Sequence, residues 1–295
     1  MDTPRSLSAT ALTWGAVSFV NAIPAGIGAS AAIRLSCTCR VLVERAPRDE
    51  GITLSLSGER ASPFLRQVLA KTAGATEERG GLRVVAHIDS QIPPGKGLKS
   101  SSAVSTCLAK SVAVALRHPL AEEALARISA EAAVETSTSV TGAFDDALTS
   151  VAGGVVVSNV REMRRLRADA LPADLRSVLW VPRKEHPSTS DLRALFSGVK
   201  EDATEAVRLA IAGRFFEAMR LNTQLVERAL GYDYAQLHAL GKEGGALASG
   251  VSGNGPALAF VVPLAKVPAV VRRLPTEGAE VISAGFIPGP SASHE

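Results

Sequence analysis

Apolar side chains on every second position mark strands in the first half of the chain. The clearest alternation places one set of residues on a common side, Ile33, Leu35, Cys37, Cys39, Val41 and Val43, opposite Arg34, Ser36, Thr38, Arg40 and Glu44. Such alternation is typical of an antiparallel strand with one buried face. The same pattern recurs at Ile52, Leu54 and Leu56, and we expect further strands over residues 9–20 and 82–88.

After residue 100 the apolar spacing becomes that of a helix. Residues 100–116 show this spacing, and a second helix is expected from about Pro119 onward. Gly153 and Gly154 then precede a short apolar strand, and the charged stretch from Arg161 to Pro172 follows. Because this stretch ends in proline, it favours a domain boundary. We therefore expect an N-terminal domain of residues 1–167 and a C-terminal domain of residues 168–295.

The second half also mixes strands and helices. We expect strands over residues 178–181, 257–262 and around 281, two helices between 200 and 230 that are split at Gly213, and helices over 234–242 and 264–274. The order of elements predicts an α+β fold in two halves.

Composition narrows the class of protein. The chain has 295 residues, of which 46% are hydrophobic and 21% are charged, as in ordinary globular proteins. Lys and Arg number 32 against 29 Asp and Glu, and this net charge of +3 is too small to indicate a nucleic-acid partner. Three cysteines cannot form a disulfide framework, and no apolar run reaches the roughly 18 residues of a membrane span. We expect a cytoplasmic protein that binds neither nucleic acid nor membrane.

A Pro/Gly loop that runs into a helix is the strongest sign of chemistry. Residues 92–103 read Ile-Pro-Pro-Gly-Lys-Gly-Leu-Lys-Ser-Ser-Ser-Ala. The free N–H groups and the positive dipole end of a helix N-terminus bind anions, and Gly97 allows a phosphate to approach the backbone. Serine hydroxyls can add hydrogen bonds or hold Mg²⁺, and Lys96 and Lys99 add positive charge. Serines also cap helices, but the whole pattern favours a phosphate site.

Two common nucleotide motifs do not fit. Neither Gly95-Lys96 nor Gly241-Lys242 has the earlier glycine and the following hydroxyl of the usual phosphate loop. Residues 26–31 match Gly-x-Gly-x-x-Ala, but strands are expected on both sides, whereas a dinucleotide fold requires a strand followed by a helix.

A stretch rich in hydroxyls and acids precedes the expected strand at residue 155. Asp145 and Asp146 lie near a helix start, where they are either favourable first-turn charges or supply a carboxylate that accepts a proton from an attacking hydroxyl. Adjacent helical residues point about 100° apart, so one of the two faces a given site. Glu131 or Glu135 on the preceding helix is available to ligate Mg²⁺. A third motif, Gly-Val-Ser-Gly-Asn-Gly-Pro at residues 250–256, is either a second ligand loop or a hairpin.

Together these motifs resemble the GHMP kinases, the superfamily of galactokinase, homoserine kinase, mevalonate kinase and phosphomevalonate kinase. Its phosphate loop, Pro-x-x-x-Gly-Leu-Gly-Ser-Ser-Ala-Ala, matches residues 93–103 except at Lys99 and Ser102, and its late glycine motif is similar to residues 252–256. Within the superfamily, the archaeal-type shikimate kinases show the greatest likeness. Their Gly-Leu-Lys-Ser-Ser-Ser and Thr-Gly-Ala-Phe-Asp-Asp stretches appear at residues 97–102 and 141–146, and their opening is similar to residues 15–31.

The resemblance implies a fold, an activity and partners. It implies an N-terminal domain with a ribosomal-protein-like fold, a C-terminal ferredoxin-like domain, and ATP and acceptor in the cleft between them. The activity it implies is Mg²⁺-dependent transfer of the γ-phosphate of ATP to the 3-hydroxyl of shikimate, a step toward chorismate and the aromatic amino acids. A second copy of the chain is a candidate partner.

The resemblance also assigns residues. By position, Asp145 corresponds to the catalytic aspartate, Ser101 to the magnesium serine and Glu135 to the magnesium glutamate, with Glu131 left open. The residues expected to bind ATP are Pro93, Pro94, Gly95, Lys96, Gly97, Leu98, Lys99, Ser100, Ser101, Ser102, Ser252, Gly253 and Gly255. Asn21 and Arg183 are expected to bind the acceptor, and Arg34 and Arg193 are further candidates for its carboxylate on chemical grounds.

One departure from the family leaves a question open. Relatives such as mevalonate kinase begin with Pro-Gly-Lys, whose lysine contacts the catalytic aspartate, but this chain has Trp14-Gly15-Ala16. Two other functions share most of the motifs: a kinase of homoserine or another small alcohol, and a catalytically silent nucleotide-binding regulator. The intact phosphate loop and acids argue against the regulator.

Overall fold

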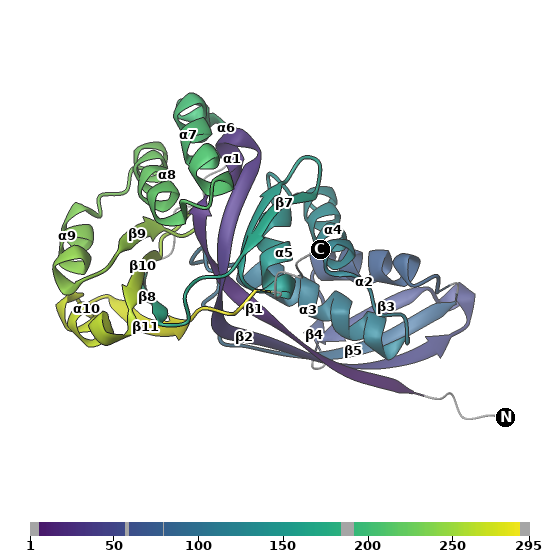
Figure 1. The fold of residues 1–295 in the computed structure, drawn as a ribbon. Helices are drawn as coiled ribbons and strands as arrows, with labels where there is room; N and C mark the ends of the chain where they lie inside the picture. The colour runs from purple at the N-terminus through teal and green to yellow at the C-terminus, as the bar shows by residue number, and fades with distance from the viewer. Residues whose placement is uncertain (1–5, 57–58, 79, 184–191, 290–295) are drawn as a thin grey trace, which may run out of the picture.

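Two long strands joined by a single helical turn extend across the molecule (Figure 1). The computed structural model describes residues 6–56, 59–78, 80–183 and 192–289. Strand β1 (Leu7–Val20) pairs antiparallel with β2 (Ile27–Ala46), and α1 (Ala22–Ala25) connects them. The predicted alternation in β2 is confirmed, because its apolar side is buried while Arg34 and Arg40 are exposed. The strand begins before the alternation does, since residues 28–32 are small and buried on both faces.

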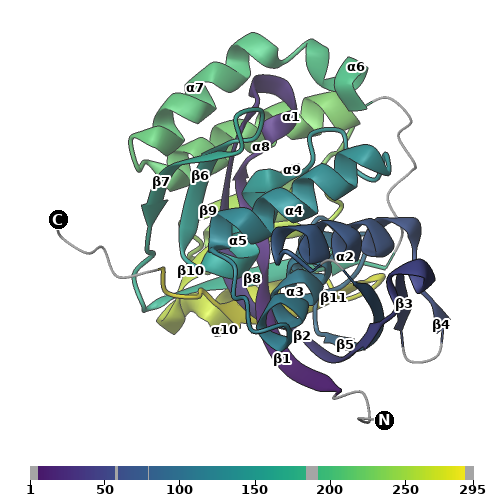
Figure 2. The same cartoon turned by 90° about the vertical axis from the view of Figure 1, so that its right-hand side faces the viewer.

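A seven-stranded sheet forms the larger part. Its order is β4-β3-β5-β2-β6-β7, and β1 adds to β2. The remaining strands are β3 (Ile52–Leu56), β4 (Glu59–Arg60), β5 (Gly81–Ser90), β6 (Val155–Asn159) and β7 (Arg164–Asp169), and a short 3₁₀ turn, η1 (Arg48–Glu50), precedes β3. Figure 2 shows four helices gathered on one side of this sheet: α2 (Pro63–Ala75), α3 (Ser100–Ala115), α4 (Glu122–Glu135) and α5 (Phe144–Ala152).

The strand expected at residues 52–56 is present as β3, and it pairs antiparallel with the short strand β4. Its pairing on the other side differs from the expected antiparallel pattern. Strand β3 pairs parallel with β5, because α2 lies between them in sequence and returns the chain to the same end of the sheet. The apolar pattern did not predict α2. Its start does carry a signal, since Ser62 Oγ accepts a hydrogen bond from Leu65 N at 3.3 Å and Pro63 occupies the first helical position.

A second, four-stranded sheet is entirely antiparallel, in the order β11-β8-β10-β9. Its strands are β8 (Leu175–Pro182), β9 (Ala248–Val251), β10 (Leu258–Pro263) and β11 (Ala279–Gly285). The helices of this part are α6 (Leu192–Ser197), α7 (Lys200–Ile211), α8 (Phe215–Leu230), α9 (Ala235–Gly244) and α10 (Val267–Arg273), with a 3₁₀ turn η2 (Leu264–Lys266). The predicted break at Gly213 is confirmed, and its φ of 80° is one that glycine adopts readily.

The charged stretch in which we expect the domain boundary contains strand β7. This strand pairs with β6 at the edge of the larger sheet, and Arg165 contacts Glu122 and Glu123 of α4 at 2.8 Å. The division expected between residues 167 and 168 therefore falls inside β7. We propose the short segment between β7 and β8 as the place where the chain passes from one part to the other.

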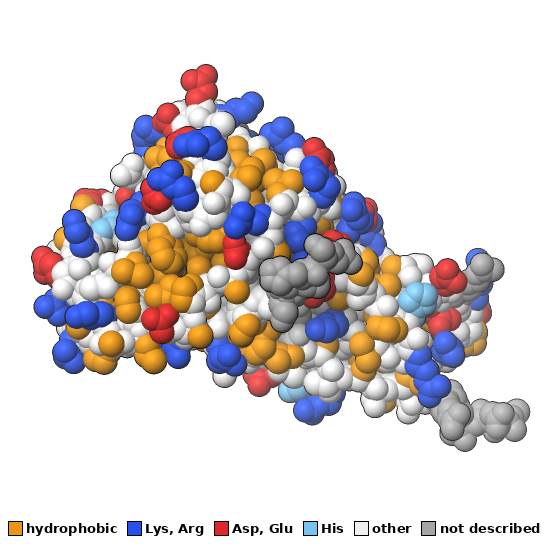
Figure 3. Space-filling view, viewed as in Figure 1, with side chains coloured by type: hydrophobic (Ala, Val, Ile, Leu, Met, Phe, Trp, Pro, Cys, Tyr) orange, Lys and Arg blue, Asp and Glu red, His pale blue; other side chains and the backbone are white. Residues whose placement is uncertain are grey.

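Charges of both signs are distributed over the face shown in Figure 3, and hydrophobic side chains gather in the part that carries the smaller sheet. Basic side chains do not form a continuous stripe on this face. In the described part of the chain, no helix is both long enough and apolar enough to cross a membrane.

Candidate active site

A cavity of about 980 Å³ receives loops from both parts of the fold. Twelve of the residues predicted to bind ATP line it: Pro93, Pro94, Gly95, Lys96, Gly97, Leu98, Lys99, Ser100, Ser101, Ser102, Gly253 and Gly255. Asn21, Arg183, Asp145 and Asp146 line it as well. The fold thus brings together motifs that are far apart in the sequence.

The loop between β5 and α3 forms one wall. The side chain of Leu98 is fully buried, and its carbonyl accepts a hydrogen bond from Ala16 N, which fixes the loop to β1. Ser100, Ser101 and Ser102 form the first turn of α3, where helix N–H groups lack partners within the helix. This wall therefore offers backbone donors, hydroxyls and the positive end of a helix dipole to an anion.

The late glycine loop braces the phosphate loop from the other part of the fold. Ser252 is fully buried, and its hydroxyl donates to Gly97 O at 2.8 Å and accepts from Ser18 N at 3.2 Å. Ala257 N donates to Lys96 O at 3.2 Å. The side chain of Ser252, which the resemblance assigned to ATP, is thus engaged with the backbone behind the cavity wall.

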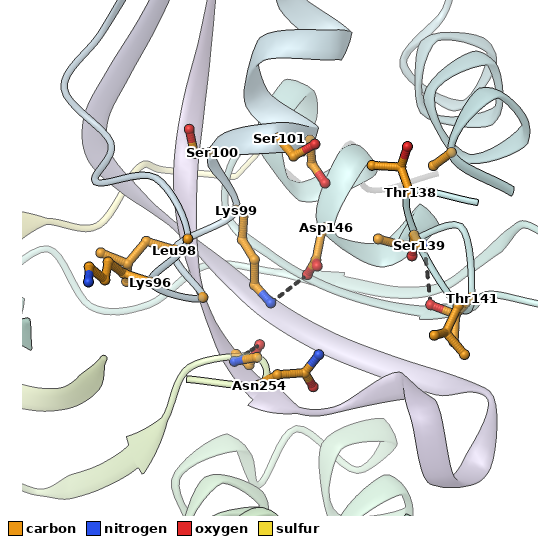
Figure 4. A pocket seen from close by; sticks show the side chains of 18 of the residues that line it. Lys96, Leu98, Lys99, Ser100, Ser101, Thr138, Ser139, Thr141, Asp146 and Asn254 are labelled. Atoms are coloured by element: carbon orange, nitrogen blue, oxygen red, sulfur yellow. Dashed lines mark hydrogen bonds and ion pairs between the residues drawn. The ribbon is translucent and has the colours of Figure 1, made fainter. Parts of the chain in front are cut away.

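Asp145 and Asp146, in the first turn of α5, have different neighbours. Asp145 is 5% exposed and lies against β2, so that a Cβ atom on Gly28 would be 1.9 Å from its Oδ2. Asp146 is directed toward Lys99, with 3.1 Å between Asp146 Oδ1 and Lys99 Nζ (Figure 4). The absence of a side chain at Gly28 makes room for one acid, and a lysine faces the other.

The pKa of Asp145 gives the stability of the protein a pH dependence. Burial and the charge of Asp146 raise this pKa from its ordinary value of 3.8 to about 7, and the charge of Lys99 lowers it in part. Because the native state holds the proton more tightly than the unfolded chain, the free energy of unfolding falls as the pH rises from about 4 to about 7 and is level above that.

We expect the free energy of unfolding of Asp145→Asn, relative to that of wild type, to be higher at pH 8 than at pH 5. Wild type loses stability over this range because Asp145 ionises while buried, whereas asparagine cannot ionise. The relative change should amount to a few kcal/mol, at about 1.4 kcal/mol per pKa unit. Urea unfolding of both proteins at the two pH values measures it. A difference between the proteins that is the same at pH 5 and pH 8 would contradict this account.

The predicted magnesium ligands are placed differently from each other. Ser101 lines the cavity. Glu135 does not; its carboxylate accepts a hydrogen bond from Gln67 and forms an ion pair with Lys71 at 2.7 Å, while Glu131 contacts the same lysine at 3.0 Å. Within the described residues, no three His, Cys, Asp or Glu side chains form a metal-binding cluster.

The predicted acceptor residues also differ in what their side chains do. Asn21 Nδ2 donates to Gly253 O and Asn254 Oδ1, at 3.1 and 2.8 Å, and its Oδ1 caps α1 by accepting from Ile23 N. This amide therefore joins the two parts of the fold. The side chain of Arg183 is exposed at the cavity, Arg193 donates to Val140 O at 2.9 Å, and Arg34 lies on β2 away from the lining.

Several lining residues were not identified from the sequence. Figure 4 shows Thr138, Ser139 and Thr141 on the opposite side of Asp146 from Lys99, and Asn254 on the late glycine loop. Ser129 of α4 and Phe64 of α2 also line the cavity. The hydroxyl-rich sequence before Asp145 was a signal for the first three, whereas Phe64 lies on the helix that the apolar pattern missed.

Comparison with known proteins decides the family. Residues 64–154 match the family described as GHMP kinases N terminal domain. A shikimate kinase of Pyrococcus abyssi is 35% identical over 246 residues, which cover 82% of this chain and 87% of that protein. The chain belongs to the archaeal-type shikimate kinase family of GHMP kinases. A shikimate kinase of Archaeoglobus fulgidus is 32% identical to this family member over 83% of the chain and 81% of the relative.

The fold of this GHMP kinase matches solved structures at low sequence identity. The crystal structure of a homoserine kinase from Cytophaga hutchinsonii superposes with a TM-score of 0.72 at 17% identity, covering 96% of each chain. The predicted α+β GHMP kinase fold is therefore confirmed.

Proposed function

We propose that this protein is a shikimate kinase that transfers the γ-phosphate of ATP to the 3-hydroxyl of shikimate, giving 3-phosphoshikimate for chorismate and aromatic amino-acid synthesis. The observation that carries the proposal is an acid, Asp146, in the same cavity as a helix N-terminus lined with glycine and serine. The choice of shikimate as the acceptor comes from the relatives, which are named shikimate kinases and whose sequence similarity extends over most of the chain.

The chemistry follows from this arrangement. Phosphoryl transfer depends mainly on positioning and on neutralising charge, because the transition state is loose and its charge lies on the equatorial oxygens. We propose that the N–H groups at the start of α3 and the ammonium group of Lys96 bind the phosphates, and both belong to residues that line the cavity. A carboxylate that accepts the proton of the acceptor hydroxyl increases its nucleophilicity as the new O–P bond forms.

Of the two adjacent acids, we propose Asp146 as the proton acceptor. Lys99 pairs with Asp146, and Ser139 and Thr141 line the same cavity. Asp145, which the resemblance assigns to catalysis, lies against Gly28 and stays a competing prediction. We propose Arg183, whose side chain is exposed and lines the cavity, as the partner of the acceptor carboxylate.

The donors at the cavity suit a magnesium ion that is bound mainly by ATP. Mg²⁺ keeps several waters and binds substrate phosphates together with few protein groups. Ser101 is the proposed protein ligand, and Glu135 would first have to leave Lys71. When bound, the ion would neutralise charge on the β- and γ-phosphates.

ADP release with MgATP and one acceptor at a time tests the proposal. We expect release with shikimate well above the blank without acceptor, and release at the level of the blank with homoserine, mevalonate and galactose. Preference for another alcohol would overturn the acceptor. Binding of ATP without turnover on any of them would support the regulator instead.

A cytoplasmic location and a homodimer are further parts of the proposal, which cell fractionation and light scattering test.

A further inference from the structure

Lys99 occupies a position that does not suit a lysine. It is the residue before the first turn of α3, with φ 69° and ψ 27°, in the left-handed region. That conformation costs an L-residue other than glycine roughly 1–2 kcal/mol. A residue at this position usually caps the helix with a side-chain oxygen, but lysine carries only donors, and Lys99 makes no cap hydrogen bond. A strained residue of this kind points to a use for its side chain elsewhere.

The side chain of Lys99 is directed into the fold. It is 7% exposed, and its Nζ lies 3.1 Å from Asp146 Oδ1. On its other side is the late glycine loop, where a Cβ atom on Gly253 would be 2.8 Å from the same Nζ. The ammonium group is therefore enclosed between α5 of one part of the fold and the glycine loop of the other.

Asp146 depends on this contact. Among the described residues, its buried Oδ1 makes no hydrogen bond of normal geometry, so the ion pair with Lys99 is the interaction that balances it. Lys96, the other lysine of the loop, is half-buried and donates to Arg183 O at 3.1 Å. The two lysines thus have different partners: Lys96 Nζ contacts the backbone carbonyl of Arg183, and Lys99 Nζ faces the acid.

We propose that Lys99 is a positioning residue that acts through Asp146, holding its carboxylate toward the acceptor and balancing its charge, and that it does not serve as a phosphate ligand. This inference rests on the proposed function. An ion pair that loses one partner leaves the other as a buried uncompensated charge. Removal of Lys99 should therefore disturb the acid, while the phosphate loop remains in place.

Kinetics of Lys99→Met, with Lys99→Arg as the conservative variant, test the inference. We expect Lys99→Met to lower kcat about a hundredfold and to change the KM for ATP less than threefold, and Lys99→Arg to recover a large part of the loss. When Asp146 is already replaced by Asn, the addition of Lys99→Met should lower kcat by a further factor of less than three. A tenfold rise in KM for ATP with kcat unchanged would make Lys99 a phosphate ligand. Full activity, or losses that simply add, would also overturn the inference.

Stability measurements separate this inference from the choice of acceptor. We expect the urea midpoint of Asp146→Asn to fall, because Lys99 is left buried without its partner, and the midpoint of the double variant with Lys99→Met to recover. Lys99→Gly adopts the left-handed backbone without strain and replaces Lys99→Met if the latter does not fold. If wild type does not phosphorylate shikimate, the proposed function fails, and this cycle still reports on the pair. Midpoint shifts that simply add would show that the pair is not coupled.

Discussion

Asp146→Asn is expected to lower kcat with shikimate and MgATP by about 10²- to 10⁴-fold, the usual contribution of a positioned general base. Asparagine keeps the size of the side chain but cannot accept the proton of the attacking hydroxyl. The phosphate loop between β5 and α3 is also held by contacts to the backbone of Leu98 and Gly97, which the substitution leaves in place, so ATP should bind the variant within about threefold of wild type. Single-turnover kinetics and calorimetric titration with ATP measure the two quantities.

Asp145→Asn is the matched comparison, because it makes the same chemical change one residue away. We expect it to lose less than tenfold in kcat, since Asp145 packs against Gly28 while Asp146 faces Lys99. The reverse order of the two losses would return the catalytic role to Asp145. Equal and small losses in both variants would remove general-base catalysis by this pair from the mechanism.

Gly97→Ala is expected to disrupt the nucleotide site. Gly97 has a φ of 80°, and a Cβ atom on it would lie 2.0 Å from Ser252 O and 3.0 Å from Gly255 O. Both contacts are with backbone, so the late glycine loop must move away and the Ser252 brace must break. We expect a loss of at least about 3 kcal/mol in the free energy of unfolding and a hundredfold weaker binding of ATP.

Gly95→Ala is the control that separates the backbone strain of a positive φ from the steric clash between the two loops. Gly95 has a similar φ of 69°, but nothing lies within 4 Å of the position of its Cβ atom. The variant should therefore show only the backbone cost, about 1 kcal/mol, and should retain ATP binding within a few-fold. Urea unfolding and ATP titration of both variants provide the comparison. If the two alanines cost the same, the contact between the loops contributes nothing to the site.

The sequence predicted those parts of the fold in which local pattern and burial agree. Alternation along β2 and the break at Gly213 are local properties, and both were found. The parallel pairing of β3 was not, because it depends on recognising α2. The charges of residues 161–172 suggested a domain boundary, but on the edge strand β7 such side chains have solvent and the acids of α4 as neighbours.

At the site, sequence identified the loops better than the roles of single residues. The phosphate loop and the late glycine loop do line one cavity. The hydroxyl of Ser252 and the amide of Asn21 are nevertheless engaged with protein groups, and Glu135 is paired with Lys71. Such assignments depend on which way a side chain turns. The cation that faces Asp146 also depends on the direction of a side chain. Lys99 of the phosphate loop supplies it, and not a lysine near the start of the chain.

The brace between Ser252 and Gly97 has a consequence for the order of events during synthesis. These two residues are separated by 155 positions, so the ribosome completes the phosphate loop long before it adds the serine that supports it. Domains of a growing chain generally fold as units, the N-terminal one first. We therefore expect the larger sheet to form before the nucleotide site is complete, so that ATP stabilises the complete chain rather than its emerging first half.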